Sequence, residues 1–600
     1  MNETTLPAMI SARIAAHGAE TILRKKDRGI WKPITWAELG ARARAIGMAL
    51  RAEGLGTGDV VGILSEATPD WIAADLGILG AGCVSVALYP TDAGPAVAHV
   101  LRDSGCRLLF VENEEQLDKI LHLRADCPDL ARIVILDMKG LRSFADPMCE
   151  SLDSFIARGM AADRADPPDH GQADAWECCI AAIDADALAV LSYTSGTTGP
   201  AVGVMLSHRN IMTQVVGVAR MTGQTAADER LAFLPMCHVT ERILGLYQAL
   251  YCRTISNLVE NAETVPENLQ EVRPTVMIAI PRVWQKFYSR IAVASTGATW
   301  LQKAAFAAAF KLNAASHGDP GLLARLAAWL VLRPARRAVG LDRLRVAWVG
   351  GAPVSPALLR WYRALGIDLR EVYSLTECAG LVAAPPGSAA IANASIGSVG
   401  QSVPYGEIAL APDGEVLVRG PHVCLGYWGQ PERSAASLAS GWLRTGDLGR
   451  IEGGNLTLTG RTSEVLTLAD GSRVSPAALE NELTLSPFIA DALVLGRSAG
   501  GLAALVMIEH DTVEKWAHDS NVAFTGFTSL VQAPEVSALV GQAVQQANAG
   551  APAGQRIAAF RLIDRNLAPE DPELTPMMKL RRDVVTTRFA TLIEDMTRAA

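Results

Sequence analysis

Six consecutive hydroxyl-bearing residues and glycines form the stretch whose chemistry is easiest to name: Thr194, Ser195, Gly196, Thr197, Thr198 and Gly199. Glycine lets the backbone turn tightly and present N–H groups to an anion, and hydroxyl groups add short donors. Such a loop fits a polyphosphate. It is not the common nucleotide loop, which needs Gly-x-x-x-x-Gly-Lys-Ser/Thr. A Ser/Gly hairpin without any ligand is the alternative interpretation of this stretch.

The residues on either side predict how the loop is held. The apolar run 187–193 predicts a strand before it, and residues 204–206 predict a short strand after it. Ser207 is a suitable N-cap for a following helix whose apolar residues recur at helical spacing. We therefore expect the loop to join two strands and to lie as a flap over phosphates.

A second candidate ligand site follows a predicted strand at 344–349. Gly350 and Gly351 form a turn, and Ser355 and Pro356 open a helix that ends at Gly366. A strand, a glycine turn and a helix place ligands at the carboxyl edge of a parallel sheet. A further strand is predicted at 369–373, leading directly into Ser374-Leu-Thr-Glu377.

The rest of the chain predicts an α/β protein. Helices are expected at 36–54 and 71–81, alternating with strands at 60–64, 83–88, 107–111 and 132–136, which implies a parallel or mixed sheet covered by helices. Residues 160–185 have the composition of a surface loop. Short glycine-separated strands after residue 396 predict a small β-barrel-like subdomain, and a new α/β pattern starts after Gly460. We expect a large N-terminal domain (1–460), a hinge (461–464) and a small mobile α+β domain (465–600).

Composition excludes several classes of protein. The chain has 600 residues and a net charge of −9, which argues against a nucleic-acid partner. Its ten cysteines are scattered, as in reduced cytosolic proteins, and the N-terminus lacks the pattern of a secretory signal. We expect a cytoplasmic protein. Residues 297–343 are rich in Ala, Leu and Arg, which fits either a solvated basic helix or peripheral contact with the inner face of a membrane. The sequence leaves a homodimer open.

Seven blocks in order make the chain resemble the adenylate-forming (AMP-binding) superfamily. They are Thr194–Gly199, Phe233-Leu-Pro-Met-Cys-His-Val-Thr-Glu-Arg242, Gly350-Gly-Ala-Pro353, Tyr373-Ser-Leu-Thr-Glu377, Gly441-Trp-Leu-Arg-Thr-Gly-Asp447, Gly460-Arg461 and Leu574-Thr-Pro-Met-Met-Lys579. Within it, the chain looks most like the long-chain acyl-CoA synthetases. The block at 238–242, Pro281-Arg-Val-Trp284 and the helical insertion that ends at 340–345 are the pointers.

The resemblance implies a two-step ligase that uses ATP, Mg²⁺ and coenzyme A. A carboxylic acid, by default a medium- or long-chain fatty acid, would attack the α-phosphorus of ATP, and the acyl group would then pass to coenzyme A. Because charge develops on phosphate oxygens, catalysis would be mainly positioning and electrostatic stabilisation. Glu377 would hold Mg²⁺, Thr376 would donate to the α-phosphate, and Lys579 would bridge the carboxylate and the nucleotide.

The remaining implied site residues surround the nucleotide and the acyl group. Tyr373 would offer a flat face to adenine, with Gly351, Ala352 and Pro353 on the other side. Asp447 would accept from the ribose hydroxyls, with Arg461 beside it. His238 would flank the acyl pocket and the approach of the thiol, and the loop near Gly471 would line the pantetheine tunnel after the small domain swings about the hinge at Ser463.

This chain departs from the family pattern in the phosphate loop and at the hinge. Val202 stands where the family has a lysine, and Ser463 stands where it has Asp or Lys. Val372 and Ser374 replace the glycines that flank the tyrosine. The chain is interpreted as an active synthetase whose backbone N–H groups, Thr197, Thr198 and Mg²⁺ manage pyrophosphate. Two alternatives stay open: a degenerate homologue that binds ligands with little turnover, and an adenylating enzyme that loads a carrier protein.

Overall fold

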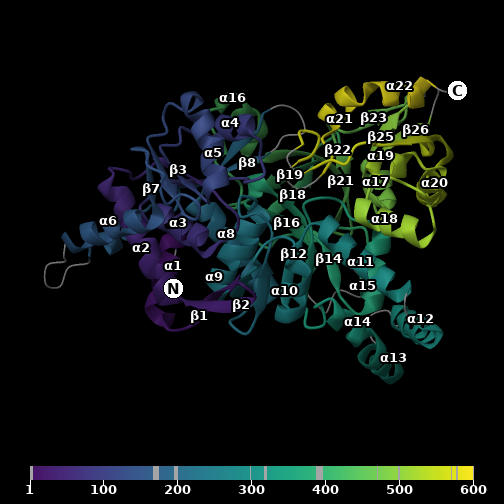
Figure 1. The fold of residues 1–600 in the computed structure, drawn as a ribbon, viewed down its shortest axis with the longest axis horizontal. Helices are drawn as coiled ribbons and strands as arrows, with labels where there is room; N and C mark the ends of the chain where they lie inside the picture. Colours follow the sequence, from purple (N-terminus) through teal and green to yellow (C-terminus); the bar gives the residue numbers. More distant parts are fainter. Residues whose placement is uncertain are drawn as a thin grey trace.

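Two domains of unequal size make up the chain in the computed structural model (Figure 1). The structure describes residues 4–165, 174–194, 200–296, 299–315, 321–386, 396–468, 471–497, 501–568, 571–575 and 579–598. The N-terminal domain occupies most of the molecule, and the green and yellow C-terminal domain lies at one end of it. The predicted α/β class, with a large first domain and a small second one, is confirmed.

An eight-stranded mixed sheet forms the first half of the N-terminal domain. Its strands, in spatial order, are β20 (Gly426–Tyr427), β9 (Val202–Ser207), β8 (Leu188–Thr194), β4 (Val84–Leu88), β3 (Val60–Leu64), β5 (Leu108–Val111), β6 (Arg132–Ile135) and β7 (Cys149–Ser151). Strands β3 and β4 are buried at every residue, as in a parallel sheet covered on both faces. The strand β9 returns antiparallel to β8, which confirms the predicted pair of strands around the loop at 194–199.

Helices cover this sheet on both faces. They are α1 (Leu6–His17), α2 (Trp36–Ala52), α3 (Pro69–Gly80), α4 (Gly94–Ser104), α5 (Glu114–Leu123), α6 (Leu152–Ala165), α7 (Ala175–Ala181) and α8 (His208–Thr222). The predicted surface loop at 160–185 is wrong in part. Helix α6 runs to Ala165 and packs Gly159 directly against the backbone of Ala45 in α2, and α7 begins after the cap Asp174. Leu152 and Phe155 of α6 are buried in the core, and Gly159 lets this helix approach α2 closely.

A three-stranded parallel sheet carries the second candidate site. Its strands are β12 (Val276–Ala279), β13 (Val346–Val349) and β14 (Leu369–Glu371). Helix α11 (Pro281–Thr296) follows β12, and α15 (Pro356–Leu365) follows β13 with Ser355 as N-cap and Gly366 as C-cap, as predicted. The single strand predicted at 369–373 is wrong. The chain leaves this sheet after Glu371, and β15 (Tyr373–Leu375) pairs instead with β16 (Gly380–Ala384), which pairs with β17 (Gln401–Ser402).

Smaller sheets complete the N-terminal domain. One contains β10 (Glu229–Ala232), β11 (Ile255–Leu258), β1 (Thr21–Asp27) and β2 (Ile30–Thr35). The antiparallel sheet of β18 (Glu407–Leu410), β19 (Glu415–Arg419), β21 (Leu443–Glu452) and β22 (Asn455–Arg461) is the predicted β-subdomain. The connecting helical segments are η2 (Thr240–Tyr247), which is π-helical, α9 (Gln248–Cys252), α10 (Val265–Val272), α12 (Trp300–Ala314), α13 (Leu322–Ala327), η3 (Ala328–Leu332), α14 (Arg333–Ala338) and α16 (Pro431–Ser437).

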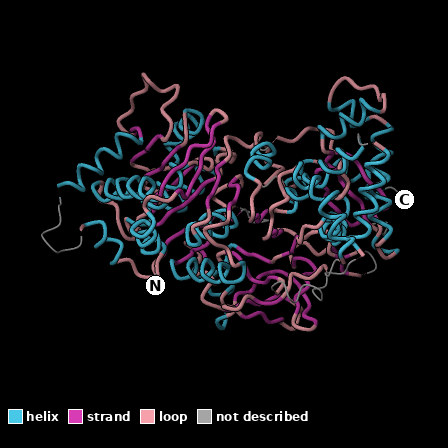
Figure 2. Tube along the Cα trace, turned by 90° about the horizontal axis from the view of Figure 1, so that it is seen from below, coloured by secondary structure: helices cyan, strands magenta, loops and turns pink. Residues whose placement is uncertain are grey.

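The C-terminal domain has its own hydrophobic core around the fully buried strand β26. Its main sheet contains β25 (Ile489–Gly496), β26 (Leu502–Ile508) and β27 (Ile557–Leu562), and the hairpin β23 (Leu466–Thr467) and β24 (Arg473–Val474) lies beside it. Figure 2 shows helices gathered around these strands at the C-terminal end. They are α17 (Ala477–Leu483), α18 (His510–Asp519), α19 (Phe527–Gln532), α20 (Pro534–Ala549), α21 (Arg582–Arg588) and α22 (Ala590–Arg598). Within the described ranges, no helix combines the length and apolar character that a membrane crossing requires.

Candidate active site

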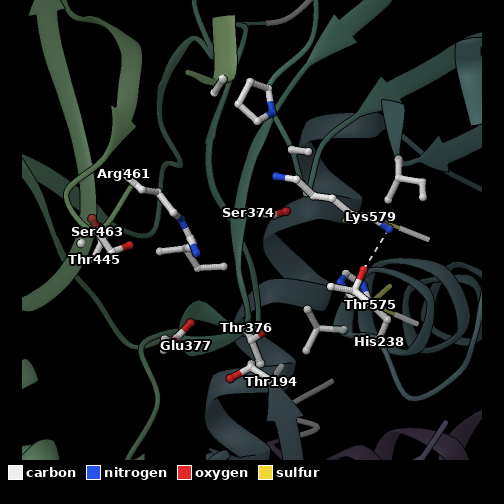
Figure 3. A pocket seen from close by; sticks show the side chains of 18 of the residues that line it. Thr194, His238, Ser374, Thr376, Glu377, Thr445, Arg461, Ser463, Thr575 and Lys579 are labelled. Carbon is white, nitrogen blue, oxygen red and sulfur yellow. Dashed lines mark hydrogen bonds between the residues drawn. The ribbon is translucent and has the colours of Figure 1, made fainter. Parts of the chain in front are cut away.

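A cavity of about 920 Å³ lies where the two domains meet, and both domains line it. It brings together nine of the residues predicted from the sequence: Thr194, His238, Gly351, Ala352, Pro353, Thr376, Glu377, Arg461 and Lys579. Figure 3 shows Thr194, Thr376 and Glu377 grouped on one side, Lys579 near His238, and Arg461 across the cavity from them. Residues separated by up to 385 positions in the sequence thus share one cleft.

Five predicted loop residues and three others do not appear in this lining. Ser195, Gly196, Thr197, Thr198 and Gly199 lie outside the described residues. Tyr373 and Asp447 lie directly behind the cavity wall, as described below. Gly471 lies at an exposed turn, where its N–H donates to the carbonyl of Leu468 at 2.9 Å and its φ is +80°.

The described residues on either side of the predicted phosphate loop lie at the cavity. Thr194 and Val202 are cross-strand partners at the open end of the β8–β9 hairpin, and both line the cavity. Helix α8 starts immediately after β9, where the Ser207 hydroxyl accepts from the N–H of Asn210 at 3.1 Å. The predicted cap is confirmed. The structure therefore fixes both ends of the loop at the cavity.

The glycine turn after β13 forms another wall. Gly351 has a φ of +85°, in the region that favours glycine. A Cβ atom on Gly350 would lie 2.9 Å from the carbonyl oxygen of Val372, so the turn approaches the next segment too closely for a side chain. Below it, Glu371 accepts from the N–H of Val354 at 3.2 Å, and burial raises the pKa of this carboxyl to about 7.

Thr376 and Glu377 occupy the short helical turn η4 (Thr376–Cys378) at the end of β15. A carboxylate oxygen of Glu377 accepts a hydrogen bond from the Tyr427 hydroxyl at 3.1 Å. No set of three or more His, Cys, Asp or Glu could hold a metal together in the described part of the chain. The Glu377 carboxylate lines the cavity and suits Mg²⁺, because this ion prefers oxygen ligands and takes most of them from phosphates and water.

Asp447 is held by two neighbours just behind the cavity wall. The Tyr373 hydroxyl donates to one carboxylate oxygen at 2.5 Å, and Nε of Arg461 donates to the other at 2.8 Å. Asp447 and Tyr373 are buried, whereas Arg461 reaches the cavity. Burial opposes the charge of Arg461, but Asp447 outweighs it and raises the pKa of this guanidinium. Tyr373 thus orients Asp447, and its ring is not part of the cavity surface.

His238 lies in the cavity wall as a neutral side chain. The backbone N–H of Thr240 donates to Nδ1 at 3.2 Å, so Nε2 carries the proton. Burial lowers the pKa of His238 to about 4. At neutral pH this residue can therefore donate a hydrogen bond from Nε2, and it does not supply a positive charge.

Lys579 enters the cavity from the C-terminal domain. Its backbone N–H donates to the Thr575 hydroxyl at 3.1 Å (Figure 3). Contacts between the domains surround this segment: the Ser355 hydroxyl donates to Glu482 at 2.8 Å, and Gln285 donates to Thr484 at 3.1 Å. These contacts join the small domain to the large one in the arrangement in which Lys579 lines the cavity.

Sequence patterns did not identify the partners of these residues. Tyr427 is separated from Glu377 by 50 positions, and no motif links them. Arg242, part of the block at 238–242, is not in the cavity. It is a buried residue that donates to Asp75 and, at 2.9 Å, to the Tyr247 hydroxyl. Buried polar groups need such partners, so this part of the block is structural.

Comparison with known proteins agrees with the fold. The family model described as AMP-binding enzyme matches residues 11–428, and the model of the AMP-binding enzyme C-terminal domain matches residues 463–600. Long-chain-fatty-acid–CoA ligase FadD15 of Mycobacterium bovis is 32% identical over 94% of this chain and 92% of its own length. Long-chain-fatty-acid–CoA ligase ACSBG2 of Rattus norvegicus is 26% identical over 99% of this chain and 92% of its own.

Solved structures share the whole architecture. The anthranilate CoA ligase AuaEII, in complex with anthranoyl-AMP, superposes with a TM-score of 0.72 at 19% identity and covers 98% of both chains. The A-PCP didomain of carboxylic acid reductase from Segniliparus rugosus, in complex with AMP, gives a TM-score of 0.75 at 19% identity and covers 99% of this chain and 82% of its own.

A two-domain α/β fold with a cavity at the domain junction, together with the two family models, defines the class as AMP-forming, adenylate-type enzymes. More specifically, this chain belongs to the AMP-binding enzyme family, whose two models together span residues 11–428 and 463–600.

Proposed function

We propose that this enzyme is an ATP-dependent fatty-acid–CoA ligase that forms an acyl-adenylate and then an acyl-CoA, releasing pyrophosphate and AMP. The observation that carries the proposal is the shared cleft, which Lys579 of the small domain lines together with Thr376 and Glu377 of the large one. The fatty-acid substrate is proposed because the relatives that match over 94% and 99% of this chain are named long-chain-fatty-acid–CoA ligases.

The proposed first step needs charge stabilisation and little proton transfer. A carboxylate oxygen forms a bond to the α-phosphorus, the bond to the β-phosphate oxygen breaks, and pyrophosphate leaves with the electron pair. Lys579 would contact both the attacking carboxylate and the α-phosphate, and the Thr376 hydroxyl would donate to the α-phosphate. Bound Mg²⁺, held by Glu377, would neutralise charge on the phosphate oxygens.

The same geometry supports the proposed positions of the nucleoside. Asp447, oriented by Tyr373 and Arg461, would accept from the ribose hydroxyls through an edge of its carboxylate. Gly351, Ala352 and Pro353 line the cavity and would contact adenine. Tyr373, buried behind the wall, would support this site from below.

The second step is proposed to use a different position of the small domain. We place the hinge at 461–464, where Ser463 lies in the cavity wall next to Arg461. Rotation there would withdraw Lys579 and bring the hairpin turn around Gly471 to the cleft, where it would line the path of the pantetheine thiol. His238, with Nε2–H as its donor, would lie beside the acyl group.

The experiment is a product analysis with the full chain, ATP, Mg²⁺ and a panel of acids of different length and shape. The proposal expects acyl-adenylate without coenzyme A, and acyl-CoA with AMP when coenzyme A is added. If the acyl group passes from the acyl-adenylate only to a carrier protein, the acceptor is the carrier protein and not coenzyme A. Nucleotide binding without acyl-adenylate from any acid would favour the degenerate homologue and refute the ligase.

We further propose that the enzyme works in peripheral contact with an anionic membrane surface, through the helical arm formed by α12, α13, η3 and α14. Among the described residues, eight of the thirteen exposed large hydrophobic side chains lie on it: Trp300, Leu301, Leu312, Leu322, Leu323, Leu326, Trp329 and Leu330. Figure 1 shows α12 and α13 projecting from the body of the molecule. An exposed apolar patch of this kind is typical of an interaction site.

The basic composition of the arm favours an anionic partner. Exposed basic residues on it are Lys303, Lys311, Arg325, Arg333 and Arg337, and residues 299–315 and 321–341 contain no Asp or Glu. The whole chain, by contrast, carries a net charge of −9. Apolar side chains including Trp beside Lys and Arg suit the boundary of a bilayer with anionic headgroups, where each basic residue contributes about 1 kcal/mol.

Vesicle flotation tests this contact without any turnover. The chain should float with vesicles that contain phosphatidylserine and remain below with phosphatidylcholine alone. Trp329→Ser with Lys311→Glu should abolish flotation, because both side chains are exposed and their loss leaves the fold intact. Ile30→Ser with Lys139→Glu, which replaces one exposed hydrophobic and one exposed basic residue away from the arm, should leave flotation unchanged. Equal flotation of both variants refutes the surface. If the parent chain instead forms a concentration-dependent dimer that only Trp329→Ser with Lys311→Glu disrupts, the arm is a surface for self-association.

A further inference from the structure

The cavity contains few cations that are available to a polyphosphate. Its described lining includes five basic side chains: Arg282, Arg433, Arg444, Arg461 and Lys579. Three of them face carboxylates of the protein. Arg282 lies 3.7 Å from Glu509, Arg444 pairs with Glu415, and Arg461 pairs with Asp447 at 2.8 Å.

Arg433 and Lys579 are the two cations of that described lining with no carboxylate in ion-pair contact. If Lys579 serves the carboxylate and the α-phosphate, the leaving β- and γ-phosphates still need a positive side chain. The position that carries a lysine in the resembling family is Val202 here, and it cannot supply one.

Arg433 is held at the cavity by its contact with Tyr427. Its guanidinium carbon lies 4.5 Å from the centre of the Tyr427 ring, a cation–π contact. The Tyr427 hydroxyl donates to Glu377 at 3.1 Å, so the arginine sits one ring away from the proposed magnesium ligand. Tyr427 also pairs with Val204 in β9, two residues after Val202. Tyr427 therefore connects Arg433 to Glu377 through its side chain and to β9 through its backbone.

The backbone that carries Arg433 is also fixed. Arg433 lies on α16, and its neighbour Ser434 accepts from the N–H of Tyr427 at 2.9 Å through its hydroxyl, which itself donates to the carbonyl of Gln430 at 2.8 Å. These bonds tie the helix to β20, which is an edge strand of the large sheet. Only the exposed guanidinium of Arg433 is free to reorient toward a ligand.

We propose that Arg433 binds the leaving pyrophosphate and takes over the charge that a lysine at Val202 would provide. The inference rests on the proposed adenylation reaction. As the bond from the α-phosphorus to the bridging oxygen breaks, the electron pair goes to pyrophosphate, and the fixed cation stabilises that charge without moving a proton. A guanidinium contacts two phosphate oxygens at once, which suits a product with several equivalent oxygens.

A double-mutant cycle tests the replacement directly. Arg433→Ala should lower the kcat/KM of ATP–pyrophosphate exchange about 10- to 100-fold, with the larger part in the KM for pyrophosphate. Val202→Lys should change the parent enzyme less than threefold, because Arg433 already supplies the charge. In the Arg433→Ala background, the same lysine should restore activity at least tenfold. Arg433→Lys should retain an intermediate activity.

The matched control is Arg419→Ala. Arg419 also stacks on an aromatic ring, 4.6 Å from the centre of Trp442, but it is outside the cavity lining. This variant should leave pyrophosphate exchange unchanged. Equal exchange by Arg433→Ala and the parent, or a gain from Val202→Lys that is the same in both backgrounds, overturns the proposal.

A binding measurement separates this inference from the ligase function. Titration calorimetry with magnesium pyrophosphate needs no turnover, and it should show at least tenfold weaker binding by Arg433→Ala than by the parent or by Arg419→Ala. If no acid yields an acyl-adenylate but this difference in affinity is present, the ligase function fails and the pyrophosphate site stands. If acyl-adenylate forms while the two affinities are equal, the ligase stands and Arg433 is not its pyrophosphate contact.

Discussion

Replacing Lys579 with alanine should remove most of the adenylation activity while leaving the fold intact. The side chain is exposed at the cavity and makes no ion pair within the described residues, so little packing is lost. The Lys579 side chain would contribute to catalysis in the closed cleft, where it would contact a carboxylate and a phosphate. A charged donor of this kind contributes about 2–4 kcal/mol to the transition state, which corresponds to a loss of about 30- to 1000-fold in rate.

The assay follows the two half-reactions separately. ATP–pyrophosphate exchange reports adenylation, and a single turnover of purified acyl-adenylate with coenzyme A reports thioester formation. Lys579→Ala should reduce the first by the stated factor and the second less than threefold, since the proposed rotation removes Lys579 before the thiol reacts. Lys515→Ala is the matched control, because Lys515 is an exposed lysine on α18 of the same domain.

Two results would refute this reasoning. Unchanged pyrophosphate exchange would show that Lys579 does not contact the reacting groups. An equal fall in both half-reactions would show that the lysine supports the cleft in general, and that the position seen in the structure serves both steps. Unfolding temperatures of the variants, which should agree within 1–2 °C, exclude a loss of structure as the cause.

Further substitutions test the electrostatics and packing around the cleft. Burial raises the pKa of Glu371 to about 7 from 4.5, so the contribution of this carboxyl to the free energy of unfolding is complete below pH 4.5 and is lost as the pH rises through 7. Glu371→Gln should therefore stabilise the protein by up to about 3 kcal/mol at pH 8 and leave its stability unchanged at pH 4.5, as measured by urea unfolding. Asp75→Ala should cost about 3–5 kcal/mol in the same measurement, because Arg242 would stay buried without its partner; a cost below 1 kcal/mol contradicts this. Tyr373→Phe removes the hydroxyl that donates to Asp447 and should raise the KM for ATP about threefold to tenfold at constant kcat, and an effect on kcat alone would argue against an orienting role.

Local signals in the sequence were sufficient to predict the elements that frame the site. Ser207 caps α8 and Ser355 caps α15, since a hydroxyl before an amphipathic run satisfies N–H groups that the helix leaves open. The glycines at 350 and 351 form a turn at the carboxyl edge of a parallel sheet, as their position after an apolar strand indicates. Each of these predictions depends on fewer than about a dozen neighbouring residues.

The secondary-structure predictions were wrong where contacts with distant parts of the backbone determine which element forms. Residues 369–373 have the composition of one strand, but the chain changes sheets after Glu371, because Tyr373 pairs with Ala383 and not with β13. Helix α6 extends through residues of polar composition as far as Ala165, and Gly159 lies in close contact with α2. The neighbouring residues in the sequence do not identify these partners. The roles of Tyr373 and Arg242 were obscured for the same reason, because both side chains meet buried carboxylates far away in the sequence.

The two cations without carboxylate partners come from different moving parts, and this difference has a mechanistic consequence. Lys579 belongs to the small domain, so the proposed rotation about 461–464 would carry it away from the nucleotide. Arg433 belongs to α16 of the large domain and is tied through Tyr427 to β9, so it would keep its place in the cleft in both positions. The charge that assists the carboxylate would thus be withdrawn after adenylation, whereas the charge that holds pyrophosphate would persist until that product diffuses away. In this arrangement, pyrophosphate should compete with ATP in either position of the small domain, and only the forward attack should depend on domain closure.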